Sequence, residues 1–440
     1  MVRILIGNEF NEDRAGIIDA KQKKTAWWTQ RLAWFARNDD ILVMAVAPDE
    51  EFLRHVTGVT GTDHATLRIV VPPPGGLGVG VLTADRLAAP ALLAELRAAL
   101  HGRHPDAVIS LHPDTSIAEL STALGAQHAL AGHSFLSQAG GRLVNSKAAF
   151  RAIAAGAGVA IPEGGVSTTP AQLVETAGRL LDRDLPVILK HEFRAGGRGN
   201  EIVTPYEGIT PVGAQRAVTV RSRAEFEAYV ERRWSWLTSN GQSPLVVERY
   251  HPGSRALFAE YSITDKGVDF GGQGELISAP LAAAEIIPAP DVADAAVTAL
   301  LDGGRALSEP LHAMGYRGTL SADAILTNDG QILFTEYNGR ITGSTPVYAV
   351  FGEQVIGPQY SRDRVLFDRD GWPVPSFAEA VAALDRSGLA YSSATGLGAV
   401  LVTPYNTSNG SVRYCLAAAC ITDVWRAQER IEALFAGTTS

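Results

Sequence analysis

Short apolar runs alternate with amphipathic stretches along the first third of the chain. Apolar runs of strand length occur at VRILIG, DILVMAVA, TLRIVVP and PDAVISLHP, and AWWTQRLAWFAR at 26–37 has the spacing of a helix. Runs that are apolar at nearly every position are typical of strands buried on both faces, so we expect a parallel sheet covered by helices. The first strand is followed by Gly7 and Asn8, without GxGxxG, which argues against a dinucleotide site there. PPPGGLGVG at 72–80 begins with prolines and leads into no clear helix, so we interpret it as a plain loop.

The rest of the chain predicts a mixture of helices and strands. A helix capped by Asn145 or Ser146 is followed by the helix AQLVETAGRLL, and further helices are predicted at 222–238, from 291 onward and at 377–386. The predicted strands are LPVILK, PLVVERY, FAEYSIT, SADAIL and LFTEYNGR, with a last strand pair split by NTSNGS. DFGGQGE is interpreted as a glycine-rich connection.

The segment LFTEYNGR carries polar side chains at every second position. In an extended chain Glu336, Asn338 and Arg340 project from one face of the strand. For any single strand, a solvated edge is the simpler interpretation of this alternation. The surrounding sequence therefore has to decide whether this face is exposed to solvent or forms part of a functional site.

A predicted hairpin brings a second carboxylate to the same face. The pair Asp329-Gly330, between SADAIL and LFTEYNGR, is a strong signal for a two-residue hairpin loop. That loop places Asp323 directly opposite Glu336, with Cβ atoms about 5 Å apart. Facing carboxylates favour a bound cation, and an oxygen-rich set without Cys or His suits Mg²⁺. Because Mg²⁺ takes its remaining ligands from water and phosphate, we expect a nucleoside triphosphate. Neutralisation of the pair by Arg340 or another Arg, with no metal bound, is the alternative.

Lysine is rare in this chain, and two lysines stand in unusual surroundings. Only six of the 38 basic residues are lysines, so a lysine kept in an apolar run suggests a task that arginine cannot perform. Lys190 ends the buried strand LPVILK, where an ammonium group is costly without an anionic partner. Lys147 opens a helix, where a cation opposes the helix dipole and favours a negative ligand nearby. Both lysines are predicted to contact phosphate.

The glycine-rich segment RAGGRGNEIV is a candidate phosphate cradle. Gly196, Gly197 and Gly199 allow backbone N–H groups to approach phosphate oxygens, and Arg198 lies among them. A flexible hairpin turn would show the same glycines. The cradle is therefore favoured only in combination with the two lysines and the carboxylate hairpin.

Composition narrows the class of protein. The chain has 440 residues, is 46% hydrophobic and carries a formal net charge of -9. Nucleic-acid and membrane-surface binders need an excess of basic residues, so neither partner is expected. Without a long apolar run or an apolar leader, a cytoplasmic enzyme acting on small molecules is the expectation. Cys415 and Cys420 are interpreted as small core residues, because nothing nearby completes a zinc site.

In combination, these motifs resemble the ATP-grasp superfamily of carboxylate–amine ligases over roughly residues 141–345. PVILKHEFRAGGRGNEIV is similar to the lysine strand and glycine loop of biotin carboxylase and its relatives, and SADAIL with LFTEYNGR to the metal hairpin of D-alanine:D-alanine ligase. The resemblance implies an α/β fold with α+β lobes: a Rossmann-like pre-ATP-grasp domain at 1–140, a small lobe at 141–250 and a large lobe at 251–440.

The resemblance also implies the cofactors ATP and Mg²⁺, with ATP lying between the lobes. Asp323, Glu336 and Asn338 would hold Mg²⁺ at the hairpin. Lys147 and Lys190 would bind the phosphates beneath the glycine loop. In this family a carboxylate is phosphorylated to an acyl phosphate, which an amine then attacks to form an amide with release of ADP and phosphate.

Further roles follow from the same resemblance. PLVVERY is similar to the adenine hinge, in which Glu248 would meet the adenine amino group and the backbone of Arg249 and Tyr250 its ring edge. Arg340 would hold the substrate carboxylate and stabilise the oxyanion. No side-chain nucleophile is required, in agreement with the absence of GxSxG and HExxH.

Two positions depart from the superfamily pattern. Arg255 stands where many relatives place a ribose-binding Glu, so ribose recognition is in doubt or comes from elsewhere. Ser321 stands where the D-alanine ligases have an Arg two residues before the first metal Asp. Arg340 would then act alone on the oxyanion.

A narrower resemblance concerns EYNGRITGSTPVY, the N-terminal start and the length, which are similar to the peptide ligase of pheganomycin biosynthesis and its actinobacterial relatives. It implies that a guanidino-bearing nonproteinogenic amino acid is joined to a peptide amine, with amino-acid and peptide substrates as partners and a homodimer as one compatible assembly. Glu260 or Glu275 could face the guanidine, although ordinary surface carboxylates are the simpler interpretation. The alternatives are a carboxylase or another ligase of primary metabolism, and a nucleotide-binding protein without catalysis.

Overall fold

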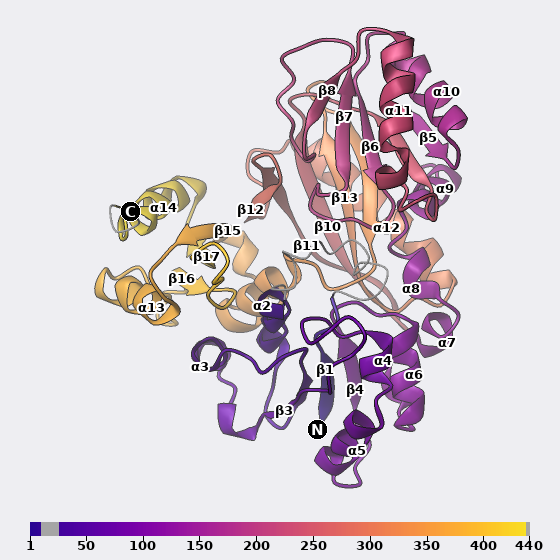
Figure 1. The fold of residues 1–440 in the computed structure, drawn as a ribbon. Coiled ribbons are helices and arrows are strands. Elements are labelled where there is room, and N and C mark those ends of the chain that lie inside the picture. The colour runs from indigo at the N-terminus through magenta and orange to yellow at the C-terminus, as the bar shows by residue number, and fades with distance from the viewer. Residues whose placement is uncertain (10–25, 437–440) are drawn as a thin grey trace.

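The computed structural model of the chain describes residues 1–9 and 26–436, and three β-sheets organise them (Figure 1). One sheet is parallel and has four strands, one has five strands, and the largest has eight. Helices pack against each sheet, which confirms the expected α/β class. The expected boundaries at residues 140 and 250 stay predictions. None of the helices in the described ranges is long and apolar enough to cross a membrane.

The parallel sheet contains the first four predicted strands, in the order β3-β2-β1-β4. Ile4, Leu5 and Ile6 are completely buried, as expected for a strand covered on both faces. The predicted helix at 26–37 is one α-helical turn that continues as a 3-10 helix. The elements of this region are β1 (Arg3–Ile6), α2 (Ala26–Thr29), η2 (Gln30–Phe35), β2 (Ile41–Val43), α3 (Glu50–Thr60), η3 (His64–Thr66), β3 (Arg68–Val70), α4 (Ala84–Leu87), α5 (Pro90–Leu100), β4 (Ala107–Ser110), α6 (Thr115–Ala123), η4 (Gln127–Ala129), α7 (His133–Leu136) and α8 (Gly140–Leu143).

The segment 72–80 lies in a loop, and a buried arginine shapes it. Arg86 is 1% exposed, and its guanidinium donates to five backbone carbonyl groups. The acceptors are the carbonyl oxygens of Ala45, Pro72, Pro73, Val79 and Val81. A phosphate loop turns its N–H groups inward, whereas this loop turns carbonyl groups inward, so the plain-loop interpretation fits the structure.

The five-stranded sheet has the order β5-β9-β6-β7-β8 and carries two helices on one face (Figure 1). Its hydrophobic core is self-contained, because every buried member lies between Leu173 and Val247. The elements are β5 (Gly164–Ser167), α10 (Pro170–Leu181), β6 (Val187–His191), β7 (Asn200–Thr204), β8 (Ala217–Thr219), α11 (Arg223–Leu237) and β9 (Leu245–Arg249). We call this unit the small sheet.

The eight-stranded sheet is antiparallel, in the order β14-β13-β10-β11-β12-β15-β17-β16. Two helices pack on its β14 end, where Phe150 meets Tyr337 edge to face. At the other end the core includes Trp34 and Phe52 from η2 and α3. The elements are α9 (Lys147–Gly156), β10 (Arg255–Thr264), β11 (Gly267–Ser278), β12 (Ala282–Ile287), α12 (Asp294–Ala313), β13 (Gly318–Leu326), β14 (Ile332–Asn338), the π-helix η5 (Pro346–Ile356), η6 (Tyr360–Arg362), β15 (Val365–Pro373), α13 (Phe377–Arg386), β16 (Gly398–Leu401), β17 (Ser411–Ala418) and α14 (Ile421–Ala433).

The glycine-rich stretch DFGGQGE is not a connection, as its composition suggested, but the centre of strand β11. Aromatic rings lie against its glycines. A Cβ on Gly274 would come within 2.7 Å of the Phe258 ring, and one on Gly272 within 3.1 Å of Tyr348. The glycines are therefore required by packing within a strand, which composition alone cannot distinguish from a loop.

One helix and one strand pair near the C-terminus follow the prediction, whereas β15 and α14 were not predicted. Helix α13 covers 377–386, and NTSNGS lies between the paired strands β16 and β17. Of the two cysteines, Cys415 is buried as expected. Cys420 is exposed at the start of α14, so its interpretation as a core residue was wrong.

Candidate active site

The hairpin of β13 and β14 places Asp323 opposite Glu336, as predicted. The predicted two-residue loop is wrong, because the Thr327 N–H donates to the Gln331 carbonyl and the strands near the turn pair one residue out of the expected register. A bulge at Thr335 restores the register. The Thr335 carbonyl accepts a hydrogen bond from Lys190 Nζ at 3.2 Å. The bulge thus both aligns the carboxylates and contacts one of the predicted lysines.

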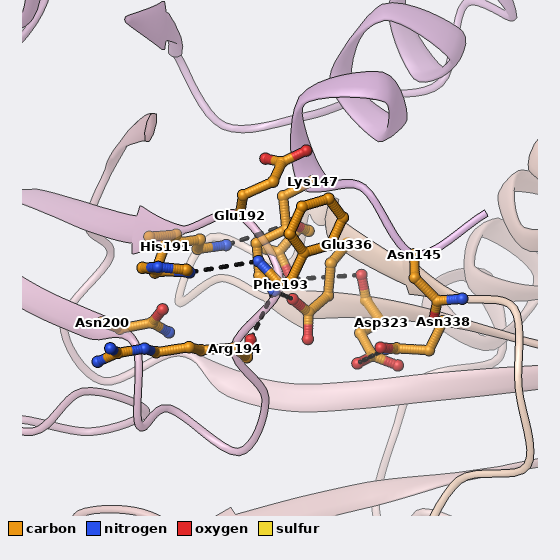
Figure 2. Close-up of polar contacts among 12 residues, drawn as sticks. Asn145, Lys147, His191, Glu192, Phe193, Arg194, Asn200, Asp323, Glu336 and Asn338 are labelled. Atoms are coloured by element: carbon orange, nitrogen blue, oxygen red, sulfur yellow. Dashed lines mark hydrogen bonds and ion pairs between the residues drawn. The ribbon is translucent and has the colours of Figure 1, made fainter. Parts of the chain in front are cut away.

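Asp323 is held by two neutral donors. Ser321 Oγ donates to its Oδ1 at 2.8 Å. Asn338 Nδ2 donates to its Oδ2 at 3.0 Å (Figure 2). Burial, together with the Glu336 charge, raises the pKa of Asp323 to about 8. The protein surroundings therefore do not fully compensate two negative charges on Asp323 and Glu336. A divalent cation between the two carboxylates would relieve that excess, and the oxygen donors Asp323, Glu336 and Asn338 suit Mg²⁺.

Lys147 and Lys190 reach this hairpin from two different elements, α9 and β6. Lys147 Nζ lies 2.8 Å from Glu336 Oε2 and also donates to the Arg194 carbonyl at 2.8 Å (Figure 2). Burial alone would raise the pKa of Glu336, but Lys147 and Lys190 outweigh it and hold the pKa at about 2. Both lysines are buried, as their apolar surroundings suggested. Their anionic partners in this structure are carboxylates.

The side chain of Glu248, in the predicted hinge PLVVERY, makes other contacts than the prediction gave it. Glu248 is 1% exposed, and its two oxygens contact Lys190 Nζ at 2.6 Å and Arg151 Nη1 at 2.8 Å. The carboxylate is therefore buried against two cations and is not presented to an adenine. The backbone N–H groups of Arg249 and Tyr250 are also engaged, by the carbonyls of Glu163 and Pro186 at 2.7 and 2.8 Å. Contact between the Arg249 to Tyr250 backbone and an adenine edge therefore stays a prediction, for which these two N–H groups are not free in this structure.

The glycine loop joins β6 to β7. Gly196 and Gly197 have φ angles of 62° and 75°, a conformation that side chains rarely adopt. A Cβ on Gly197 would come within 2.9 Å of the Gly213 backbone, and one on Gly199 within 2.4 Å of Arg194. The loop is thus packed closely against its neighbours. Arg198 is exposed, and its carbonyl accepts a hydrogen bond from Gln215 Nε2.

Arg340 extends from the end of the hairpin and meets Asn145. Its Nη1 donates to Asn145 Oδ1, while Asn145 Nδ2 donates to the carbonyls of Gly141 and Gly339 at 2.9 and 3.3 Å. Burial lowers the pKa of the Arg340 guanidinium, and Glu9, with the hairpin carboxylates, acts in the opposite direction. The sequence suggested Asn145 only as a helix cap, whereas Ser146 is the cap.

Glu192 is a site residue that the sequence did not reveal. It is 2% exposed, and its carboxylate accepts hydrogen bonds from Ser146 Oγ and from the Ala148 N–H at 3.1 Å. These donors form the N-terminus of α9, where a carboxylate is stabilised by the helix dipole. Glu192 therefore ties the strand of Lys190 to the helix of Lys147. Its spacing of two from Lys190, which gives both side chains one strand face, was the available signal.

The two departures from the family pattern have local explanations. Arg255 forms an ion pair with Glu275 at 2.7 Å and donates to the carbonyls of Pro290 and Asp291, and Ser321 bonds to Asp323. Glu275 is thus already neutralised. Neither Glu275 nor Glu260 is available to a guanidine in this structure.

Glu260 is completely buried, and hydroxyl groups surround its carboxylate. Thr345 Oγ1 donates to it at 2.9 Å, and the hydroxyls of Thr342 and Ser344 donate as well. Burial raises the pKa of this carboxyl group. Glu260 therefore anchors the segment that follows Arg340.

Comparison with known proteins concerns the fold and the N-terminal region of the chain. Residues 29–126 match the family model of the Pre ATP-grasp domain. No curated protein sequence matches the chain. Solved structures that are similar include N5-carboxyaminoimidazole ribonucleotide synthetase from Thermus thermophilus, with a TM-score of 0.56, 15% identity and coverage of 99% of this chain and 98% of that chain. L-amino acid ligase from Bacillus licheniformis has a TM-score of 0.53 and 13% identity, with coverage of 98% and 97%.

A third similar structure is the biotin carboxylase domain of the Hydrogenobacter thermophilus 2-oxoglutarate carboxylase, determined with ADP, its magnesium salt and bicarbonate. Its TM-score is 0.57 and its identity 14%, with coverage of 97% of this chain and 89% of that chain. At these identities the likeness concerns the fold. The chain therefore has an ATP-grasp fold preceded by a pre-ATP-grasp domain.

Proposed function

We propose that the protein is an ATP-dependent ligase that joins a carboxylate to an amine and releases ADP and phosphate. The observation that carries this proposal is the meeting of Lys147, Lys190 and the facing carboxylates Asp323 and Glu336 beside the glycine loop. Two lysines and a carboxylate pair at one point suit a polyphosphate and its metal ion. Among the described residues, no group of three or more His, Cys, Asp or Glu side chains forms a self-sufficient metal site. Phosphate oxygens would therefore complete the coordination.

In this proposal each residue has a task in binding or orientation. Asp323, Glu336 and the Asn338 oxygen would hold Mg²⁺, which when bound would offset charge on the phosphate oxygens. Lys147 and Lys190 would exchange their carboxylate partners for phosphate oxygens as ATP, a substrate here, enters under the glycine loop. Glu192 keeps the two lysine-bearing elements together.

Arg340 would bind the substrate carboxylate. A carboxylate oxygen then takes the γ-phosphoryl group as ADP leaves. The amine nitrogen next attacks the acyl carbon of the acyl phosphate, so that a C–N bond forms, phosphate departs and the nitrogen loses a proton. Arg340, with Asn145 fixing its guanidinium, is placed to stabilise the oxyanion of that addition.

The finer proposal is a peptide ligase of peptide natural-product biosynthesis, joining a guanidino-bearing amino acid to a peptide amine. Its support is the sequence resemblance of EYNGRITGSTPVY and the likeness of the fold to that of an L-amino acid ligase. A carboxylase is the second candidate. The likeness of the fold to N5-carboxyaminoimidazole ribonucleotide synthetase and to the biotin carboxylase domain of 2-oxoglutarate carboxylase favours it.

A substrate screen tests the proposal. Purified protein with MgATP is supplied with amino acids and short peptides, and ADP release and the mass of the amide are measured. We expect substrate-dependent ADP and a product that has lost one water relative to its parts. Release of AMP and pyrophosphate would contradict the proposal, and turnover that requires bicarbonate would favour the carboxylase. Glu336→Gln serves as the inactivated control.

A further inference from the structure

A second group of buried charges lies on the large sheet, on strands β12, β15 and β17. Arg413 Nε donates to Asp368 Oδ2 at 2.7 Å, and Arg413 Nη2 lies 3.3 Å from Glu285 Oε1. Glu285 is 8% exposed, Asp368 0% and Arg413 7%. The Trp28 ring covers the Arg413 guanidinium, with 5.2 Å from Cζ to the ring centroid. One buried cation thus faces two buried carboxylates.

The second oxygen of each carboxylate has no hydrogen-bond partner among the residues that the structure describes. These atoms are Glu285 Oε2 and Asp368 Oδ1. Leaving a buried carboxylate oxygen without a donor costs free energy, more than for a neutral group. Burial, opposed by Arg413 and reinforced by Asp368, raises the pKa of Glu285 to about 7. The cluster therefore lacks hydrogen-bond donors for these two oxygens, although Arg31 as well as Arg413 acts on both carboxylates.

The cluster lies beside the segment that follows Arg340. A Cβ on Gly343 would come within 3.2 Å of Glu285 Oε1 and 3.8 Å of Arg413 Nη2. The two residues between Arg340 and Gly343 are fixed by Arg31, whose Nη2 donates to their carbonyls at 3.3 and 3.4 Å. The Glu285 carboxylate, through the oxygen that faces Arg413, thus lies against the same continuous segment as the residue proposed to hold the substrate carboxylate.

We propose that Glu285 and Asp368 form a subsite for a positively charged nitrogen group of one of the two substrates. An ammonium or guanidinium group brings the N–H donors that both oxygens lack, and it neutralises the excess carboxylate. A divalent metal fits less well, because among the described residues no group of three or more His, Cys, Asp or Glu side chains could hold a metal ion. That the ligand of this subsite is a substrate rests on the proposed function. The preference for a positively charged ligand follows from Glu285 and Asp368 alone.

Arginine and citrulline derivatives test the subsite, because citrulline is close to arginine in shape but uncharged. N-acetylarginine and N-acetylcitrulline present only a carboxylate for ligation, whereas argininamide and citrullinamide present only an α-amine. Binding of each to the full chain with MgADP is measured by calorimetry. We expect one arginine derivative to bind roughly ten-fold tighter than its citrulline counterpart. The pair that shows this difference identifies which substrate carries the cation.

Two variants place the preference at this cluster. Glu285→Gln is expected to remove the difference between the arginine and citrulline derivatives. Glu285→Asp keeps the charge and should retain part of the difference even if both variants melt at a lower temperature. Glu275→Gln, which removes a carboxylate paired with Arg255 on the same sheet, should leave the difference unchanged.

Equal binding within both pairs by the natural chain would overturn the subsite, and so would a preference that survives Glu285→Gln unchanged. These results do not depend on turnover. If the chain prefers the arginine derivatives but no substrate releases ADP, the subsite stands and the ligase proposal fails. If ADP release occurs without any charge preference, the ligase proposal stands and the subsite fails.

Discussion

The small sheet and the N-terminal domain, which is the parallel sheet with the elements β1 to α8, contact the eight-stranded sheet in opposite ways. The eight-stranded sheet is called the large sheet. The core of the small sheet is its own, and its contacts with α9 and the hairpin are polar: Arg151 to Glu248, Glu192 to the start of α9, and Lys190 to the Thr335 carbonyl. The N-terminal elements η2 and α3 instead share one hydrophobic core with the C-terminal strands. The first contact consists mainly of ion pairs and hydrogen bonds, whereas the second buries apolar surface and adds hydrogen bonds such as that from Trp34 Nε1 to the Val402 carbonyl.

The difference matters because polar contacts can change partners one at a time. A lysine that leaves a carboxylate for a phosphate keeps its charge compensated, so the small sheet can shift when a nucleotide enters. Separating a shared core exposes its whole apolar area to water at once, which is costly. We infer that the N-terminal domain and the large sheet act as a fixed frame and that the small sheet is the element that moves.

Trp34→Ala tests the fixed frame and should have the largest effect. Trp34 is 2% exposed, lies against Phe351 and donates from Nε1 to the Val402 carbonyl at 3.1 Å. Its removal should lower the free energy of unfolding by about 3–5 kcal/mol, because a large buried ring is replaced by a cavity. Denaturant unfolding measures the loss. Trp425→Ala, at a tryptophan that is 41% exposed, is the matched control, and an equal loss there would contradict the shared core.

Glu336→Gln tests the polar contact at its most charged point. The change removes a proposed metal ligand and the partner of Lys147. We expect substrate-dependent ADP release to fall roughly 100-fold or more, with a much smaller change in the free energy of unfolding than in Trp34→Ala. A titration of ADP release against Mg²⁺ concentration checks the metal role. An unchanged rate and an unchanged Mg²⁺ dependence would exclude Glu336 from the site.

Lys190→Ala should act mainly on nucleotide binding. The ammonium group would contact phosphate in the ground state as well as in the transition state, so KM for ATP should rise roughly ten-fold while kcat changes less. Some stability is also lost, because Glu248 keeps only Arg151 as a cationic partner. Steady-state kinetics in ATP separate the two constants. A fall in kcat at constant KM would contradict a phosphate-binding role.

The hairpin shows how far the sequence could predict the site. Alternation along LFTEYNGR and the Asp-Gly signal predicted that Asp323 faces Glu336, which the structure confirms. The loop is one residue longer than predicted, and the bulge at Thr335 offsets that error. The alternation of polar and apolar residues indicates which face of a strand a side chain occupies. The position of a bulge depends instead on contacts with distant residues, such as that between Lys190 and the Thr335 carbonyl.

The missed features depend on contacts between distant parts of the chain. Arg151 occupies the Glu248 carboxylate from 97 residues away, so a hinge role read from PLVVERY could not anticipate it. The same holds for β11, whose glycines are explained only by the rings of Phe258 and Tyr348. Local sequence predicted most of the strands and helices, because hydrophobic periodicity is a local signal. It could not predict which cation neutralises which carboxylate.

The smallest predicted effect is a pH dependence of stability caused by His55, which tests whether water reaches the interface between α3 and β16. His55 Nε2 accepts a hydrogen bond from the Leu401 N–H at 3.0 Å, and burial lowers the pKa of the imidazole from 6.5 to about 4. Because the unfolded chain binds this proton at higher pH than the folded protein, stability falls as the pH drops from about 6.5 toward 4. Between pH 7 and pH 5.5 the loss should be about 1 kcal/mol, and His55→Gln should abolish that part of the pH dependence. Denaturant unfolding at both pH values measures it, with the exposed His104→Gln as control. An identical pH dependence in His55→Gln and the natural chain would mean that water reaches this interface, and the contrast with the small sheet would then be one of degree.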